Sequence, residues 1–350
     1  MDLVGERRAD VETTGPALTS AAMAPQLSTA DVDLEHEMKA HRRELTGYCY
    51  PMLGSGAEAE DAVQEAYVRA WKAFDRFEGR SSVRSWLYRI ANHVCIDMHR
   101  APQRRARPMD LGPSSTVATA ELRPQAENTF VQPVADGRVI DLDGDPAAVA
   151  DARESIRLAF VAALQHLPAR QRAVLILCEV LKWQATEVAE LLDTTVASVN
   201  SALQRSRATL AELKLDQLDA TVDPEHEALL ARYVAAFEAY DMTALASLLR
   251  DDVVMSMPPF DLWLQGPTDL VEFMVGPGHE CAGSKLVPVF ANGTEAFGSY
   301  KPAGPGRWEP WAIQVIETCD GSEVCPTLEH QIPDLEPRDP EPPDMDLAGP

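Results

Sequence analysis

Apolar residues recur every three or four positions through much of the first 212 residues, which is the spacing of amphipathic helices. The pattern predicts helices over 34–50, 58–74 and 83–99, and helical structure again over 151–212. The apolar stripe of the second helix consists of Ala62, Val63, Ala66, Tyr67, Ala70, Trp71 and Phe74. Near the end of this part, Thr186–Leu192 and Val196–Leu210 are separated by a tight turn, which is typical of a helix-turn-helix.

Beyond residue 250 the periodicity changes to that of short strands, and Ala291-Asn292-Gly293-Thr294 has the composition of a hairpin turn. A helix is expected to begin at Asp223-Pro224, because Asp is a good N-cap and Pro fits the first helical position. Strands are expected at Asp252–Met257, Leu286–Ala291, Glu295–Tyr300 and Trp308–Thr318. The C-terminal third is therefore predicted to be an α+β domain.

Three segments lack a periodic pattern. Residues 1–33 and 329–350 have compositions typical of disorder. Residues 108–150 contain five prolines and seven acidic residues against two basic ones. This acidic linker is longer than an ordinary loop in a compact domain, which suggests either disorder or a functional thread. Three domains remain, over 34–107, 151–214 and 222–328.

The net charge of −24 would repel a nucleic acid, but the charge is distributed unevenly. Residues 69–107 contain ten Lys and Arg against three acidic residues. Residues 58–65 contain four acidic residues and no basic one. A chain of this kind is expected to contact DNA through one segment and a basic protein surface through another.

The N-terminus lacks an apolar signal segment, and no run of eighteen apolar residues indicates a membrane span. The six cysteines are scattered without a CxxC pair. We therefore expect a cytoplasmic protein with reduced thiols and no bound metal.

The segment that contains the helix over 83–99 combines arginines with aromatic rings, a set that suits single-stranded DNA. Its candidate residues are Arg80, Arg84, Trp86, Tyr88, Arg89, Asn92, His93 and Arg100. The second helix of the helix-turn-helix carries Asn200, Ser201, Gln204, Arg205 and Arg207, which are types that bond base edges or phosphates. The alternatives are a solvated basic surface for the first segment and an ordinary three-helix packing unit for the second.

Three strings together resemble the extracytoplasmic-function sigma factors of bacterial RNA polymerase. Residues 61–71 are similar to their region 2.2, residues 77–92 to their regions 2.3 and 2.4, and residues 167–174 with the helix-turn-helix to their region 4. The C-terminal third resembles a SnoaL-like domain, the α+β cone shared with ketosteroid isomerase, at Trp263–Gly266, Asn292–Phe297 and Pro310–Val315. That match fades after Gly321, so irregular structure is expected in place of the last strand and helix, which would leave the cone incomplete.

The resemblance implies a mainly α protein with a C-terminal α+β domain, and it implies roles for individual residues. Asp61, Gln64 and Glu65 would dock on core polymerase. The −10 element would be held by Arg80, Ser81, Ser82, Val83, Arg84, Trp86, Arg89, Asn92 and His93. The −35 element would be read by Ser198, Asn200, Ser201, Gln204, Arg205 and Arg207. Asn200 stands where many family members have Arg, which leaves the −35 sequence open. The linker would thread the RNA channel of the polymerase, with Thr129–Val139 near the active-site cleft.

The resulting prediction is a transcription initiation factor without catalytic residues or cofactors, whose partners are core polymerase and promoter DNA. We expect the C-terminal domain to modulate activity by restraining the DNA-reading domains. Trp263, Leu264 and Phe297 could supply the contact, although each can equally be core. The main alternative is a ligand-binding or isomerase-like cone, for which the candidates are Tyr233, Asp241, Asp261 and Tyr300. A free-standing repressor is disfavoured by the acidic helix and the overall charge.

Overall fold

The computed structural model describes residues 33–98, 105–119, 122–126, 128–213, 224–319 and 323–330. The predicted disordered N-terminus, residues 331–350 of the predicted tail, and the connector Leu215–Thr221 lie outside these residues, apart from Asp33. The helices are α1 (Leu34–Leu53), α2 (Gly56–Ala73), α3 (Val83–Met98), α4 (Pro108–Leu111), α5 (Asp136–Val139), α6 (Pro146–Ser155), α7 (Leu158–Leu164), α8 (Ala169–Leu175), α9 (Ala185–Leu191), α10 (Val196–Glu212), α11 (Pro224–Glu238), α12 (Met242–Ala246) and α13 (Pro267–Val275). The strands are β1 (Val254–Ser256), β2 (Trp263–Gln265), β3 (Lys285–Ala291), β4 (Thr294–Pro302), β5 (Trp308–Cys319) and β6 (Glu323–His330).

Helices α1, α2 and α3 form the first helical domain, and local sequence sets their ends. The Asp33 side chain accepts a hydrogen bond from the backbone N–H of His36 at 3.1 Å and caps α1. Helix α1 ends at Gly54, whose φ of 74° is the left-handed conformation that glycine adopts readily. Ser55 then caps α2 by accepting from the N–H of Glu58. The three helices predicted from periodicity are confirmed to within a few residues.

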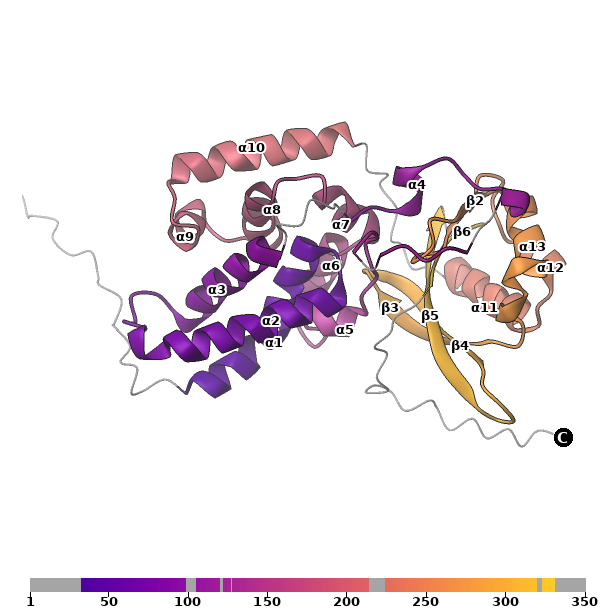
Figure 1. The fold of residues 1–350 in the computed structure, drawn as a ribbon, viewed down its shortest axis with the longest axis horizontal. Coiled ribbons are helices and arrows are strands. Elements are labelled where there is room, and N and C mark those ends of the chain that lie inside the picture. The colour runs from indigo at the N-terminus through magenta and orange to yellow at the C-terminus, as the bar shows by residue number, and fades with distance from the viewer. Residues whose placement is uncertain are drawn as a thin grey trace, which may run out of the picture.

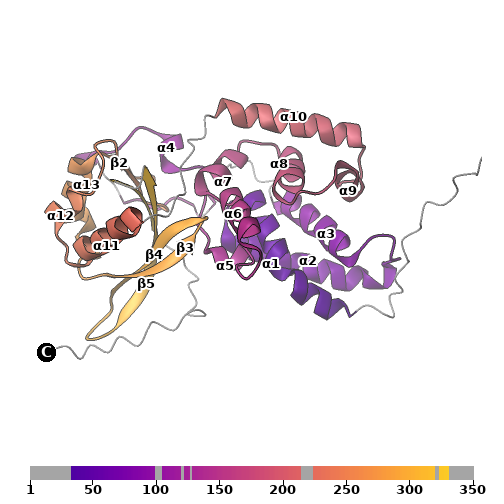
Figure 2. The same ribbon diagram turned by 180° about the vertical axis from the view of Figure 1, so that it is seen from behind.

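Helices α7 to α10 form the helix-turn-helix domain, which packs directly on the first helical domain (Figures 1 and 2). Leu45 and Leu87 of the first domain, Val131 and Val134 of the linker, and Val161 of the second domain are members of one buried apolar cluster. The two helical domains and the linker therefore share a single hydrophobic core.

The C-terminal domain has its own core, around Tyr233, Phe237, Leu264 and Phe273. Its main sheet has the antiparallel order β3-β4-β5-β6, and β1 pairs with β2 in a separate two-stranded sheet. Helices α11, α12 and α13 lie on the side of this domain farthest from the helical domains (Figures 1 and 2). The predicted strands correspond to β1, β3, β4 and β5, and the predicted turn joins β3 to β4.

Two features of the C-terminal domain correct the sequence prediction. Strand β2 was not expected, and β6 occupies residues that were predicted to be irregular. Strand β6 pairs with β5 from Ala312↔His330 to Cys319↔Glu323, so it completes a four-stranded sheet. Pro326 lacks a backbone N–H, and an edge strand such as β6 is the place where a sheet tolerates proline.

The linker follows a defined path between the helical domains and the C-terminal domain (Figure 1). On the helical side, Gln132 donates its backbone N–H to the carbonyl of Gly54 at 2.9 Å. On the other side, Ser115 donates to the carbonyl of Trp263 at 2.8 Å, and Ala135 forms an antiparallel bridge with Ala291. These contacts contradict disorder in the described part of the linker, and the functional thread stays a prediction.

The predicted fold class, mainly helical with a C-terminal α+β domain, is confirmed. Within the described ranges, no helix has an apolar stretch long enough to cross a membrane.

Candidate nucleic-acid interface

Helix α10 presents a continuous polar face to solvent. Thr195 caps the helix by accepting from the N–H of Ser198, and Val199, Ala202 and Ser206 are buried against the rest of the domain. The opposite face exposes Asn200, Ser201, Gln204 and Arg205, all predicted to read DNA. Arg207 is exposed and forms an ion pair with Glu179, whereas Ser198 is half-buried. The face has the size and the donor and acceptor groups of a major-groove reading helix.

The acidic face of α2 is also exposed, and it contains more apolar surface than expected. Asp61, Gln64 and Glu65 all point away from the core, and Glu65 pairs with Arg69 at 2.7 Å. Trp71 was predicted to be in the buried stripe, but it is 65% exposed. On a helical wheel at 100° per residue, the buried alanines of α2 are centred well away from Trp71, so this spacing could have revealed its exposure.

Val68 is 45% exposed and lies next to Trp71 on the same face of α2. The candidate docking surface is therefore a mixture of carboxylates and two apolar side chains. A mixed surface of this kind suits a protein partner better than a solvated helix face.

Arg84 in the first turn of α3 is held in place by contacts from both helical domains. Its Nε lies 3.0 Å from both carboxylate oxygens of Glu44. Its guanidinium lies 5.2 Å from the ring centroid of Tyr88 and 5.1 Å from that of Trp183, which belongs to the helix-turn-helix domain. Arg84, which was predicted to hold a promoter base, therefore contacts the helix-turn-helix domain in this structure.

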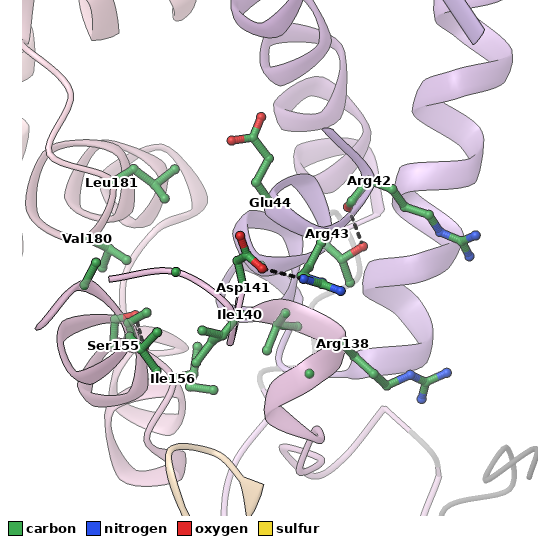
Figure 3. Close-up of a pocket in the computed structure, with 18 of the residues that line it drawn as sticks. Arg42, Arg43, Glu44, Arg138, Ile140, Asp141, Ser155, Ile156, Val180 and Leu181 are labelled. Carbon is green, nitrogen blue, oxygen red and sulfur yellow. Dashed lines mark hydrogen bonds and ion pairs between the residues drawn. The ribbon is translucent and has the colours of Figure 1, made fainter. Parts of the chain in front are cut away.

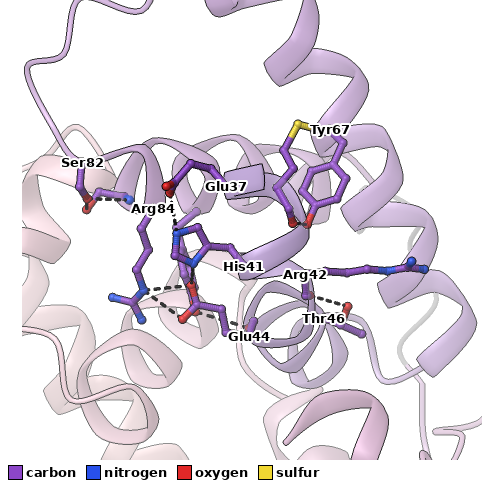
Figure 4. Close-up of polar contacts among 11 residues, drawn as sticks. Glu37, His41, Arg42, Glu44, Thr46, Tyr67, Ser82 and Arg84 are labelled. Atoms are coloured by element: carbon purple, nitrogen blue, oxygen red, sulfur yellow. Dashed lines mark hydrogen bonds and ion pairs between the residues drawn. The ribbon is translucent and has the colours of Figure 1, made fainter. Parts of the chain in front are cut away.

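Figure 4 shows that Glu44 is shared between Arg84 and His41. His41 Nδ1 lies 2.6 Å from Glu44, and His41 Nε2 lies 3.2 Å from Glu37. These contacts link the surface of α1 to the start of α3. They fix the position of Arg84 before any DNA is bound.

Arg89, one turn further along α3, also reaches the other helical domain. Its Nη2 donates to the carbonyl of Glu190 in α9 at 2.9 Å. Helix α9 therefore lies beside the part of α3 that was predicted to contact the −10 element (Figure 1).

Two residues of the predicted −10 set are buried in this structure. Val83 is 4% exposed, and Asn92 is 2% exposed with its Oδ1 accepting from the Tyr48 hydroxyl at 2.9 Å. Both side chains are therefore buried in this DNA-free arrangement, and their contact with the −10 element stays a prediction.

The remaining members of that set lie around the start of α3, except His93, which lies in the second half of the helix. Arg80 is exposed beside Glu78, and Ser82 caps α3 by accepting from the N–H of Ser85 at 3.1 Å. Trp86 is half-buried and packs on Phe77 with ring centroids 4.9 Å apart. Two further members are Ser81, which is half-buried, and His93, which is exposed.

The candidate residues for an enzyme in the C-terminal domain each have a structural partner or position. Asp241 caps α12 by accepting from the N–H groups of Thr243 and Ala244. Asp261 accepts from the side chain of Gln125 in the linker at 3.3 Å. Tyr233 is buried and donates to Gln314 at 2.9 Å, and burial raises the pKa of its hydroxyl.

Tyr300 is half-buried in β4. Tyr233, Asp241 and Asp261 thus bond to Gln314, to the start of α12 and to Gln125, rather than to one another. Among the described residues, no group of three or more His, Cys, Asp or Glu side chains could hold a metal ion.

The contact between the C-terminal domain and the rest of the chain differs from the predicted one. Leu264 and Phe297 are core residues of that domain. Trp263 does reach the linker, where its indole N–H donates to the carbonyl of Gly112 at 2.9 Å. The buried contact is instead made by Asn292 at the β3–β4 turn, which the sequence indicated only as a turn residue.

A groove of about 1140 Å³ lies between α1 and the linker, with walls from α5 and α6 (Figure 3). Arg43 of α1 pairs with Asp141 of the linker across it at 2.7 Å. Arg138 pairs with Glu60 of α2 at 3.0 Å. These pairs fasten the linker to the first helical domain at points that remain accessible to water.

Comparison with known proteins adds two family matches. The model for Sigma-70 region 2 matches residues 38–105, and that for Sigma-70, region 4 matches residues 157–210. The first match covers most of α1 and all of α2 and α3, and the second covers α7 to α9 and most of α10.

The chain is 43% identical over 290 residues to the ECF RNA polymerase sigma factor SigG of Mycobacterium tuberculosis, which covers 81% of this chain and 78% of that protein. It is 29% identical over 249 residues to the ECF RNA polymerase sigma factor SigJ of the same organism, covering 69% of this chain and 72% of SigJ. The crystal structure of that extracytoplasmic function sigma factor SigJ has a TM-score of 0.51 and 25% identity, covering 85% of this chain and 95% of the SigJ chain.

Proposed function

This chain belongs to the extracytoplasmic-function RNA polymerase sigma factors, whose task is promoter recognition at the start of transcription, and we propose that three of its surfaces divide that task. The exposed face of α10 reads the −35 element through Asn200, Ser201, Gln204 and Arg205. The first turns of α3 and the preceding loop hold the −10 element. The acidic face of α2 docks on core polymerase.

The observation that carries this proposal is the exposed polar face of α10 in a chain of this family. Asn and Gln offer the paired donor and acceptor that recognise adenine, and Arg recognises guanine or phosphate. The hydroxyl of Ser201 can donate to or accept from any of these groups. The acidic residues Asp61 and Glu65 repel DNA, so α2 is suited to a basic protein surface.

The described arrangement is a closed state that must open on the promoter. The −35 and −10 elements are about 25 base pairs apart, which is about 85 Å of duplex at 3.4 Å per base pair. Here region 2 and region 4 share one core, and Arg89 contacts the carbonyl of Glu190 directly. One chain cannot span both elements in this state, so region 4 separates from region 2 when the polymerase and promoter bind.

The linker then becomes available to the polymerase. Its acidic composition resembles that of a nucleic acid backbone, which supports a path through the RNA channel. We propose that Thr129–Val139 lies near the active-site cleft of the complex. A photocrosslinker at Phe130 or Val134 should reach residues of that cleft, and crosslinks confined to the outer surface of the polymerase would contradict this path.

The C-terminal domain modulates this opening, since the linker bonds to it on one side and to region 2 on the other. We assign the chain no reaction of its own. Tyr233, Asp241 and Asp261 have structural partners, and the chemistry of initiation belongs to core polymerase.

Reconstitution with core polymerase, followed by sequencing of selected promoter DNA, tests the main function. The expected result is a bipartite promoter, and failure to yield transcripts from any selected DNA would contradict it. Deleting 222–350 should change run-off transcript yield at equal core occupancy, and deleting only 329–350 should have a different effect. Equal yields from the three proteins would leave the C-terminal domain without a role in initiation.

A further inference from the structure

The β3–β4 turn, Asn292-Gly293, extends out of the C-terminal domain and enters a socket formed by the other parts of the chain. We call this the turn socket, and its residues are Tyr50 of α1, Val134 and Asp136 of the linker, Arg153 of α6, and Ile156. Asn292 is only 1% exposed, although hairpin turns normally face solvent. Its burial indicates that the turn has a binding role within the molecule.

The side chain of Asn292 bonds to three segments at once. Its Nδ2 donates to the Tyr50 hydroxyl and to the Ile156 carbonyl, both at 2.6 Å. Its Oδ1 accepts from the N–H of Val134 at 2.8 Å, and its own backbone N–H donates to the Val134 carbonyl at 3.0 Å. An amide supplies two donors and an acceptor on one planar group, which a carboxylate or a hydroxyl cannot match.

Gly293 completes the contact and allows no side chain. Its N–H donates to Asp136 Oδ1 at 2.9 Å, and the other oxygen of Asp136 accepts from Arg153 Nε at 3.0 Å. A Cβ at position 293 would lie 2.3 Å from the carbonyl oxygen of Arg153. The φ of +73° at Gly293 is the left-handed conformation of a hairpin turn.

The socket exists only in the closed state. Tyr50 belongs to region 2, whereas Ile156 lies between α6 and α7, the first helix of region 4, and the linker residues lie between them in the sequence. Tyr50 also donates its hydroxyl to the carbonyl of Gln132 at 2.9 Å, so the linker is bonded from both sides. If the linker moves away from region 2, Asn292 must lose either its bond to Tyr50 or its bonds to the linker.

We infer that the β3–β4 turn fastens the linker in the closed state and competes with core polymerase for it. The inference rests on the proposed function, because it takes the polymerase as the competitor. While the turn occupies the socket, Val134 and Asp136 are bonded to it and cannot enter the RNA channel of the polymerase. When the polymerase takes the linker, the turn must leave the socket.

Gly293→Ala tests the inference in the full-length protein, with Gly306→Ala as a matched control. Gly306 lies in the β4–β5 turn with a φ of +67° and nothing within 4 Å of its Cβ position, so the two variants carry similar backbone strain. Gly293→Ala should increase amide exchange over 129–140 in the free protein. It should also tighten apparent binding to core polymerase by about tenfold, equivalent to about 1.4 kcal/mol. Exchange and affinity equal to those of Gly306→Ala would overturn the inference.

A disulfide across the contact should have the opposite effect. Ala135 and Ala291 form an antiparallel bridge, and the bond from Asn292 N–H to the Val134 carbonyl makes this a non-hydrogen-bonded pair. Such pairs have Cα atoms about 4.5 Å apart, which a disulfide can span. The double variant A135C/A291C, oxidised with diamide, should bind core polymerase at least tenfold more weakly and recover with dithiothreitol. Oxidised wild type is the control, and unimpaired binding of the crosslinked protein would refute competition for the linker.

The two readouts separate this inference from the proposed function. Amide exchange is measured on the free protein, without polymerase. A wild-type chain that fails to transcribe with core polymerase would contradict the function. A wild-type chain that transcribes, together with a Gly293→Ala variant that behaves as Gly306→Ala does, would contradict the fastening role alone.

Discussion

Replacing Trp183 with alanine should loosen the contact between region 4 and the −10 surface of region 2. Trp183 packs on Tyr88 with ring centroids 5.0 Å apart, and the guanidinium of Arg84 lies 5.1 Å from its ring. Arg84 would keep its bond to Glu44 in the variant but lose its contact with region 4. The closed state alone contains the Trp183 contacts, so their loss favours opening.

The size of the effect follows from the two contacts. An aromatic pair contributes about 0.5–1.5 kcal/mol beyond its buried area, and a partly exposed cation–π contact contributes about 0.5–1 kcal/mol. Because both involve Trp183 and sit side by side, their energies are not additive, and we expect a total of about 1–2 kcal/mol. That total is about a 5- to 30-fold shift of the equilibrium between closed and open states.

The assay measures the apparent Kd by fluorescence anisotropy. A labelled single-stranded oligonucleotide with the −10 sequence of the selected promoter is titrated with the full-length protein in the absence of polymerase. When the binding-competent state is a minor one, the apparent Kd falls in proportion as that state becomes more populated. Trp183→Ala should therefore lower the apparent Kd about 5- to 30-fold, and Trp183→Phe should lower it less. Trp308→Ala, in the β4–β5 hairpin of the C-terminal domain, is the control. Equal affinities for wild type, Trp183→Ala and Trp308→Ala would refute the reasoning.

Three further predictions concern the other surfaces and the shared core. Asp61→Arg with Glu65→Arg should weaken pull-down of core polymerase at moderate salt while far-UV circular dichroism stays unchanged, because both side chains are exposed. Gln204→Ala should reduce the binding free energy that discriminates bases at one or two −35 positions by about 1–3 kcal/mol. A variant that keeps the full −35 preference in competition binding would exclude a role for Gln204 in reading this element. Arg172 is fully buried, and its guanidinium donates to the carbonyls of Met52, Gln165 and Leu167. Arg172→Met should therefore destabilise the helical domains by at least about 3 kcal/mol in thermal unfolding, whereas Arg170→Met, which alters an exposed side chain on the same helix, should not.

Local pattern was sufficient for most of the secondary structure. Helix α3 was predicted over 83–99 and runs over Val83–Met98, because its apolar residues follow the helical period without interruption. The Asn-Gly turn between β3 and β4 was predicted because two consecutive left-handed residues favour that pair. Such features depend on neighbours in the sequence, so the sequence reveals them directly.

The missed features depend on partners that are distant in the sequence. Asn92 was expected on the surface of its helix, but it is buried and its oxygen accepts from Tyr48 on another helix. Asn292 looked like an ordinary turn residue, and its partners Tyr50 and Ile156 lie 242 and 136 positions away. The linker appeared irregular because its own helices α4 and α5 are only four residues long and because other hydrogen bonds of the linker go to distant segments.

The chemistry of the closed state indicates what must replace each of its contacts when it opens. Asn292 and Asp136 are held by hydrogen bonds, and polar groups that separate regain water, so each bond contributes only about 0.5–1.5 kcal/mol net. Val131 and Val134 of the linker belong to the shared apolar core, and exposing such side chains to water costs about 1.5–3 kcal/mol each. The five hydrogen bonds of the turn together contribute about 2.5–7.5 kcal/mol, which is similar to the total of about 3–6 kcal/mol for the two valines. The two contacts differ in what replaces them, because the polar groups of the turn can bond to water, whereas the valines need apolar surface from the polymerase. Capture of the linker therefore requires an apolar surface on the polymerase as well as displacement of the turn.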